Sequence, residues 1–128
     1  MNEKQTARAN RLAGEVVMGW EVDNYNIADW ESDLYGADEM FFEDRYPVMP
    51  VIAFCPCSNW GHAGMVIDKM IELKYKIAME HLAVPSCFMW KDAPIVDGNI
   101  FSGETLQEVV VKTALACFGY DADAEAER

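Results

Sequence analysis

Apolar residues recur every three or four positions in three segments of the chain, which is the spacing of one buried helix face. The segments are residues 3–18, 60–73 and 104–117. Gly19 is expected to end the first helix in the left-handed conformation, and Gly119 is expected to end the third. The pattern therefore predicts three amphipathic helices.

Between these helices the pattern changes to the period of strands. Residues 47–54, "PVMPVIAF", are rich in β-branched and aromatic residues. "YKIAMEHLA", from Tyr75, alternates with Lys76, Ala78 and Glu80 on one face, and "CFMW" is expected to pair with it as an antiparallel neighbour. The predicted fold is α+β: an α-β-α sandwich with a small, mainly antiparallel sheet of about four strands and helices on both faces.

Length and composition favour one compact domain over residues 1–120, because 128 residues with 52% hydrophobic side chains can close one core. The acidic end, residues 121–128, is predicted to be a disordered tail. The polar start of the chain and the absence of a long apolar run predict a cytoplasmic protein with no membrane contact. Its four cysteines are then expected to be thiols.

Acidic residues dominate the charge, which is −12 at pH 7. Nine carboxylates and no Lys or Arg lie between Glu21 and Asp44, in a segment that could form one or two strands or a long loop. Such a field repels nucleic-acid phosphates, so general nucleic-acid binding is not expected. A small anion remains possible in a local pocket, because salt screens distant charges.

Two kinds of chemistry are conceivable in "FCPCSNWGHAG", residues 54–64. Cys55, Cys57 and His62 are zinc-type ligands, although common zinc modules place two residues between their cysteines. Alternatively, Cys57 lies just before a helix start, which would lower the pKa of its thiol and favour a nucleophile. No orienting carboxylate accompanies it at a recognisable place. We therefore predict neither a metal nor another cofactor, and no catalytic residue.

The simplest interpretation of the same stretch is a capped helix start, in which Ser58 or Asn59 accepts a hydrogen bond from the first turn. Gly61 would leave backbone N–H groups open to a phosphate, while Trp60 would offer a stacking surface. A lysine could neutralise the ligand's charge. The expected contacts of a small nucleotide-like ligand are Ser58, Asn59, Trp60, Gly61, His62, Trp20, Lys74 and Lys76.

Three motifs resemble those of the phage ABA sandwich domain, a family of small bacteriophage and prophage proteins. They are "VMGW" at residues 17–20, "PCSNWGHA" at 56–63 and "ETLQEVVVKTALA" at 104–116. The second motif departs from the family pattern at Cys57, Asn59, Gly61 and His62. The resemblance implies an α-β-α sandwich and a phage gene product acting inside a bacterium, but no particular activity.

These observations favour a non-enzymatic phage protein that sequesters a nucleotide-type immune signal of the host, such as a cyclic nucleotide or an ADP-ribose derivative. A closed site in so small a domain would favour a homo-oligomer. One alternative is an inhibitor that uses residues 21–44 to mimic DNA or to bind a host defence protein. Another is a structural or assembly component of the phage particle, which would be found in purified virions.

Overall fold

A computed structural model describes residues 1–24, 39–81, 84–91, 99–102 and 104–123. Its helical elements are α1 (Glu3–Leu12), which continues into the π-helical turn η1 (Ala13–Val17), the 3₁₀ turn η2 (Val51–Ala53), α3 (Trp60–Glu72) and α4 (Leu106–Cys117). The strands are β1 (Glu21–Asn24), β2 (Glu39–Glu43), β3 (Tyr46–Pro50), β4 (Lys76–His81), β5 (Pro85–Trp90) and β6 (Asn99–Ser102). The α+β class, the three amphipathic helices and the antiparallel pairing are as predicted.

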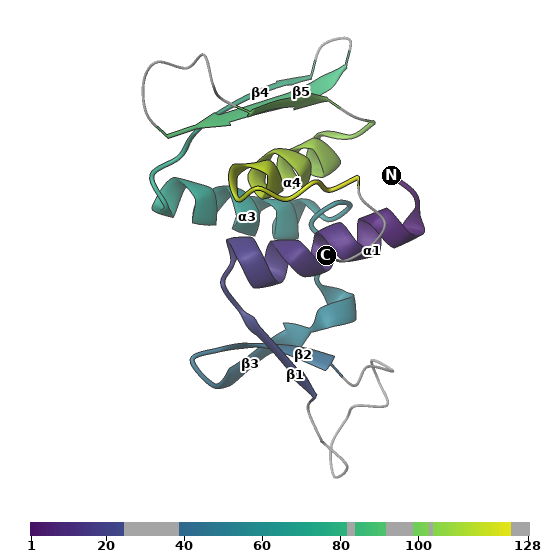
Figure 1. Cartoon of the computed structure of the whole chain (residues 1–128), viewed down its shortest axis with the longest axis vertical. Coiled ribbons are helices and arrows are strands. Elements are labelled where there is room, and N and C mark those ends of the chain that lie inside the picture. Colours follow the sequence, from purple (N-terminus) through teal and green to yellow (C-terminus); the bar gives the residue numbers. More distant parts are fainter. Residues whose placement is uncertain (25–38, 82–83, 92–98, 103, 124–128) are drawn as a thin grey trace.

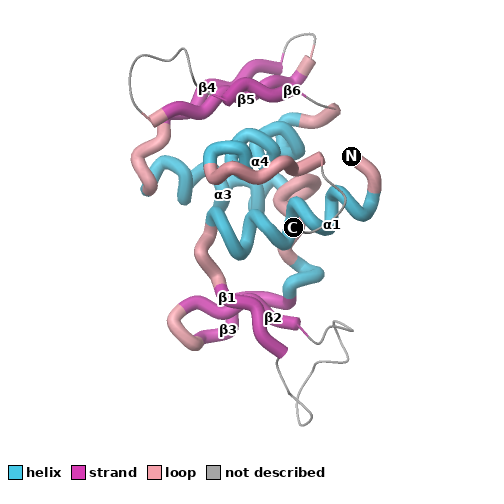
Figure 2. The backbone as a smooth tube through the Cα atoms, viewed as in Figure 1, coloured by secondary structure: helices cyan, strands magenta, loops and turns pink. Residues whose placement is uncertain are grey.

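The order of the layers differs from the prediction. The described strands form two three-stranded antiparallel sheets, β1-β2-β3 and β4-β5-β6, instead of one sheet of about four strands. Figures 1 and 2 show the helices between these sheets, which lie at opposite ends of the molecule. α4 packs on β5 and β6, while η1 and η2 contact β1 and β2. Helices therefore separate the two sheets and do not enclose a single one.

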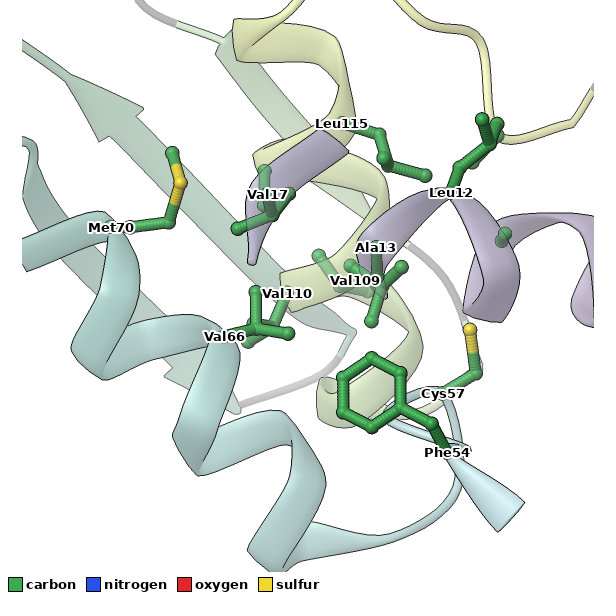
Figure 3. Packing of buried hydrophobic residues seen from close by; sticks show 14 of the residues in the cluster. Leu12, Ala13, Val17, Phe54, Cys57, Val66, Met70, Val109, Val110 and Leu115 are labelled. Carbon is green, nitrogen blue, oxygen red and sulfur yellow. The ribbon is translucent and has the colours of Figure 1, made fainter. Parts of the chain in front are cut away.

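The core lies among the helices and the inner face of the β4-β5-β6 sheet. Val66 and Met70 of α3 are fully buried together with Val109, Val110 and Leu115 of α4 (Figure 3). The one buried polar side chain among the described residues, Thr113, donates to the carbonyl of Val109 at 2.8 Å. Its demand for a hydrogen bond is thus satisfied inside α4. The amphipathic spacing read from the sequence corresponds to this buried face.

A close approach between η1 and β2 requires a glycine at position 14. A Cβ atom at Gly14 would lie 2.4 Å from Cζ of Phe41, so only glycine leaves room for that ring. Gly14 belongs to η1, and its carbonyl accepts from the amide of Trp20 at 3.0 Å. Gly19 between them has φ of 74°, which confirms the predicted left-handed end.

In the β1-β2-β3 sheet, the hairpin between β2 and β3 has a turn of unusual composition. Asp44 and Arg45 have φ of 51° and 73°, and Glu43 pairs with Tyr46 across them. Two successive positive φ angles are the geometry of a type I′ turn, which normally takes Asn-Gly. The strand predicted for residues 47–54 is wrong in its second half, because the chain turns into η2 directly after Pro50.

The disordered tail was predicted to start at residue 121, but residues 121–123 are packed against the rest of the chain. Ala122 is buried, Lys112 Nζ lies 3.1 Å from a carboxylate oxygen of Asp123, and Arg8 donates to the carbonyl of Asp121 at 2.7 Å. Residues 121–123 therefore pack on α1 and α4, while 124–128 lie outside the described residues. Most of the acidic segment, residues 25–38, lies outside them too. None of the helices within the described ranges is long and apolar enough to span a bilayer.

Candidate functional site

The start of α3 is a capped turn, as predicted, and Asn59 is the cap. Its Oδ1 accepts from the amide of His62 at 3.0 Å, while the amides of Ser58 and Asn59 both donate to the carbonyl of Cys55. A Cβ atom at Gly61 would lie 3.1 Å from Oδ1 of Asn59. Gly61 therefore makes room for the cap, which is a structural reason for a glycine here.

The side chain of His62 stabilises the turn that precedes α3. Its Nδ1 accepts a hydrogen bond from the amide of Cys55 at 3.1 Å, and its ring packs on Phe54 with centroids 5.3 Å apart. An accepting Nδ1 places the ring proton of the neutral imidazole on Nε2. One side of the imidazole is thus committed to holding the turn, which leaves only Nε2 for another partner.

Cys57 does not have the properties expected of a nucleophile. Its side chain is buried at the edge of the core beside Phe54 (Figure 3), and burial raises the pKa of its thiol to about 12. The predicted lowering by a helix start is wrong, because α3 begins only at Trp60 and desolvation of the thiolate dominates. Cys57 is consequently protonated at neutral pH.

The alternative zinc set is not assembled either. Cys55 Sγ lies 3.8 Å from Nδ1 of His62, but that nitrogen is already the acceptor for the amide of Cys55. Over the described ranges, no three His, Cys, Asp or Glu side chains gather as metal ligands. Cys55, Cys57 and His62 therefore form no tetrahedral site. All four cysteines are thiols, as expected from the sequence.

The eight predicted ligand contacts are divided among three places. Trp20 is 5% exposed and packs against Phe41 and Phe54 at centroid distances of 5.3 and 5.0 Å, so it belongs to the core. Lys74 and Lys76 follow the far end of α3, whose 13 residues span about 20 Å. Neither lysine can contact a ligand held at the first turn of that helix.

Trp60 is the exposed aromatic residue left at the start of α3, with 52% of its surface accessible. The amides of Trp60 and Gly61 precede the first intrahelical hydrogen bonds, so they have no acceptor within the helix. Ser58 and Asn59 are exposed beside them. This turn retains a ring and two amide donors, but the cations predicted to accompany them are elsewhere.

Lys76 instead lies beside a pair of stacked aromatic rings on β5. The rings of Phe88 and Trp90 have centroids 4.8 Å apart and planes inclined by 23°. In the antiparallel register, Lys76 is opposite Trp90 and Ala78 is opposite Phe88. We call the surface formed by Lys76, Ala78, Phe88 and Trp90 the outer face.

Strand alternation explains why these four residues share one surface. Cys87 and Met89 of β5 are buried against the helices, and the hydroxyl oxygen of Thr113 in α4 lies 3.3 Å from the carbonyl oxygen of Cys87. Their neighbours Phe88 and Trp90 must then point away from the helices, with Lys76 and Ala78 on the adjacent strand. The outer face is therefore the side of the sheet opposite α4.

Basic residues gather at one end of this sheet. Exposed Lys74 lies two residues before β4, and Lys91 follows β5, where its Nζ lies 5.4 Å from the ring centroid of Tyr75. Tyr75 in turn lies 6.5 Å from the ring of Phe118 at the end of α4, so Lys91 is directed towards the helices, and of these three lysines the strand register places Lys76 on the outer face. Glu80 is on the outer face too, but four residues along β4 it is about 13 Å from Lys76. The combination of rings and cations is therefore confined to the Trp90 end.

Comparison with known proteins identifies the fold alone. No protein-family model matches the chain, and no curated protein matches it. Among solved structures, a phage protein from Bacillus cereus is similar, with a TM-score of 0.64 over 94% of this chain and 94% of that one, at 17% identity. The chain is thus similar in fold to a phage protein of nearly the same extent.

Proposed function

We propose that this chain is a phage protein that binds and sequesters a small nucleotide-type signal of the host, such as a cyclic nucleotide or an ADP-ribose derivative, in the bacterial cytoplasm. The observation that carries the proposal is the outer face, where stacked Phe88 and Trp90 lie beside Lys76. The fold of the Bacillus cereus phage protein and the three phage-like sequence motifs support the phage origin.

The outer face matches the chemistry of a nucleotide. A flat aromatic surface binds a base by stacking, which is worth about 1–3 kcal/mol per base. The ammonium groups of Lys74 and Lys76 supply charge for a phosphate within reach of that base. The acidic remainder of the chain opposes long polyanions such as DNA, whereas a small dianion can approach the lysines locally because salt screens the field within about 8 Å.

Sequestration requires affinity but no reaction. Binding lowers the free concentration of a signal by mass action when the protein is abundant relative to the ligand. The contacts proposed here are ring surfaces and ammonium groups, which hold a ligand without supplying a nucleophile. The buried thiol of Cys57, with its raised pKa, does not take part.

Thermal shift with a panel of cyclic di- and trinucleotides and cyclic ADP-ribose isomers tests the proposal. At least one compound should raise the melting temperature of the wild type and fail to raise that of Trp90→Ala or Lys76→Glu. Trp60→Ala is the matched control, because it removes an exposed tryptophan from the other candidate surface. Loss of the shift in Trp60→Ala alone would place the ligand at the start of α3, and no shift with any compound would refute nucleotide binding.

A second candidate function has support from one observation. Tyr46 is 76% exposed at the end of the β2–β3 hairpin, next to the carboxylates of Glu43 and Asp44. Although Arg45 also lies in this turn, an exposed aromatic residue beside two carboxylates suits contact with a basic patch on a host defence protein. If this is the function, Tyr46→Ala abolishes inhibition of that protein while Trp90→Ala leaves it intact.

A further inference from the structure

The outer face is open on one side. Figures 1 and 2 show the described helices on the opposite side of the β4-β5-β6 sheet, with no described element over the outer face. A base stacked on Trp90 would leave its other face in water, and lysines of one chain alone would neutralise its phosphate. Such a half-site binds weakly, because much of the ligand surface stays solvated.

We propose that a second copy of this chain completes the site, so that two outer faces enclose one cyclic dinucleotide. This inference rests on the proposed function and specifies its ligand class. In a two-fold pair the same residues are contributed twice. Each copy would offer Trp90 to one base and Lys76 to one phosphate, which matches a ligand that itself has two bases and two phosphates related by a two-fold axis.

Charge makes this pairing depend on the ligand. Each chain carries a net charge of −12, so two chains repel one another over long distances. In a pair whose two-fold axis passes near Lys76, the Lys76 ammonium groups of both copies also face each other. A dianion between the sheets replaces this local repulsion with attraction. The free protein is therefore expected to be monomeric at this face, and the bound protein to be paired.

The apolar contribution comes from the same four residues. Phe88 and Trp90 are half-buried and already stacked, so their rings are held in place before a ligand arrives. Ala78 opposite Phe88 has no long side chain that would keep a second sheet away. A preorganised surface loses little side-chain entropy on binding.

Sedimentation velocity of the full chain with cyclic di-AMP and cyclic di-GMP as probes tests the pairing. With the bound probe, the wild type should change from monomer to dimer, and calorimetry should give one probe per two chains. Lys76→Glu should remove both binding and pairing, while Trp60→Ala should behave as wild type.

A third variant separates pairing from binding. Ser86→Glu places a second carboxylate beside Glu80, at the end of the outer face away from Lys76, and so adds repulsion between two copies. It should weaken the pairing and the affinity together, at least tenfold, without unfolding the chain. A monomeric complex with one probe per chain would overturn the pairing and leave the proposed function intact. Failure of both probes to bind would overturn the pairing, and the function itself fails only if the rest of the nucleotide panel gives no shift.

Discussion

Replacing Gly14 with alanine tests the contact that joins the first helix to the β1-β2-β3 sheet. The added Cβ would lie 2.4, 2.7 and 2.9 Å from three ring atoms of Phe41, whereas carbon atoms in contact prefer about 3.5–4.0 Å. The ring cannot simply withdraw, because Phe41 is fully buried and packs on Trp20 and Phe54. Forced overpacking of this kind costs about 1–3 kcal/mol.

Gly64→Ala is the matched control, because Gly64 lies within α3 and a Cβ atom there would meet nothing within 4 Å. Alanine should stabilise that helix by about 0.5–1 kcal/mol. Urea denaturation at pH 7 should thus move the midpoint down for Gly14→Ala and up for Gly64→Ala. In the double variant Gly14→Ala/Phe41→Leu, the total loss should be smaller than the sum of the two single losses, because the smaller side chain makes room for the added Cβ. A Gly14→Ala protein as stable as the wild type would refute the reasoning.

Three further perturbations have expected outcomes by urea denaturation. Asn59→Ala should cost about 1 kcal/mol by removing the cap of α3, with Ser58→Ala near neutral; equal effects would argue against Asn59 as the cap. Replacing Asp44 and Arg45 with Asn-Gly should stabilise the hairpin by about 1 kcal/mol, because Asn and Gly tolerate positive φ, and no gain would contradict the type I′ turn. The Cys57 thiol has a raised pKa of about 12, so its stabilising effect is complete below its ordinary value of 9.0 and is lost as the pH rises towards 12. Cys57→Ala should flatten this decline, and an unchanged pH profile would contradict the burial argument.

The helices could be predicted because their evidence is local. Apolar spacing, the helix cap and the left-handed Gly19 act within a few residues, and the structure selects Asn59 from the two predicted caps, Ser58 and Asn59. The antiparallel pairing of β4 with β5 was local too, since short connections favour neighbouring strands. These features needed no knowledge of the rest of the chain.

The division into two sheets could not be read in this way. The pattern of a strand shows which of its faces is buried, but not which sheet the strand joins. The apolar run in residues 47–54 likewise does not show that the chain leaves the sheet after Pro50 and forms η2. Trp20 was expected to contact a ligand, but Phe41 and Phe54 enclose it from distant parts of the chain. Burial of this kind depends on tertiary contacts.

The candidate site was predicted in pieces. Lys76 was expected near a ligand, but its partners Phe88 and Trp90 were read only as strand residues. Counting alternate positions in "YKIAMEHLA" and "CFMW" together would have placed Lys76, Phe88 and Trp90 on one face. The length of α3 alone would have separated Lys76 from Trp60. Sequence information was therefore sufficient for the surface once the register of the hairpin was known.

Capture of the ligand from infected cells tests the central claim most directly. Wild type, Trp60→Ala and the double variant Lys76→Glu/Trp90→Ala would be incubated with lysate, recovered and denatured, and the released small molecules identified by mass spectrometry. We predict a phosphate-containing nucleotide that is enriched on the wild type and Trp60→Ala and absent from the double variant. No enriched nucleotide on the wild type, or equal amounts on the double variant, would contradict the account.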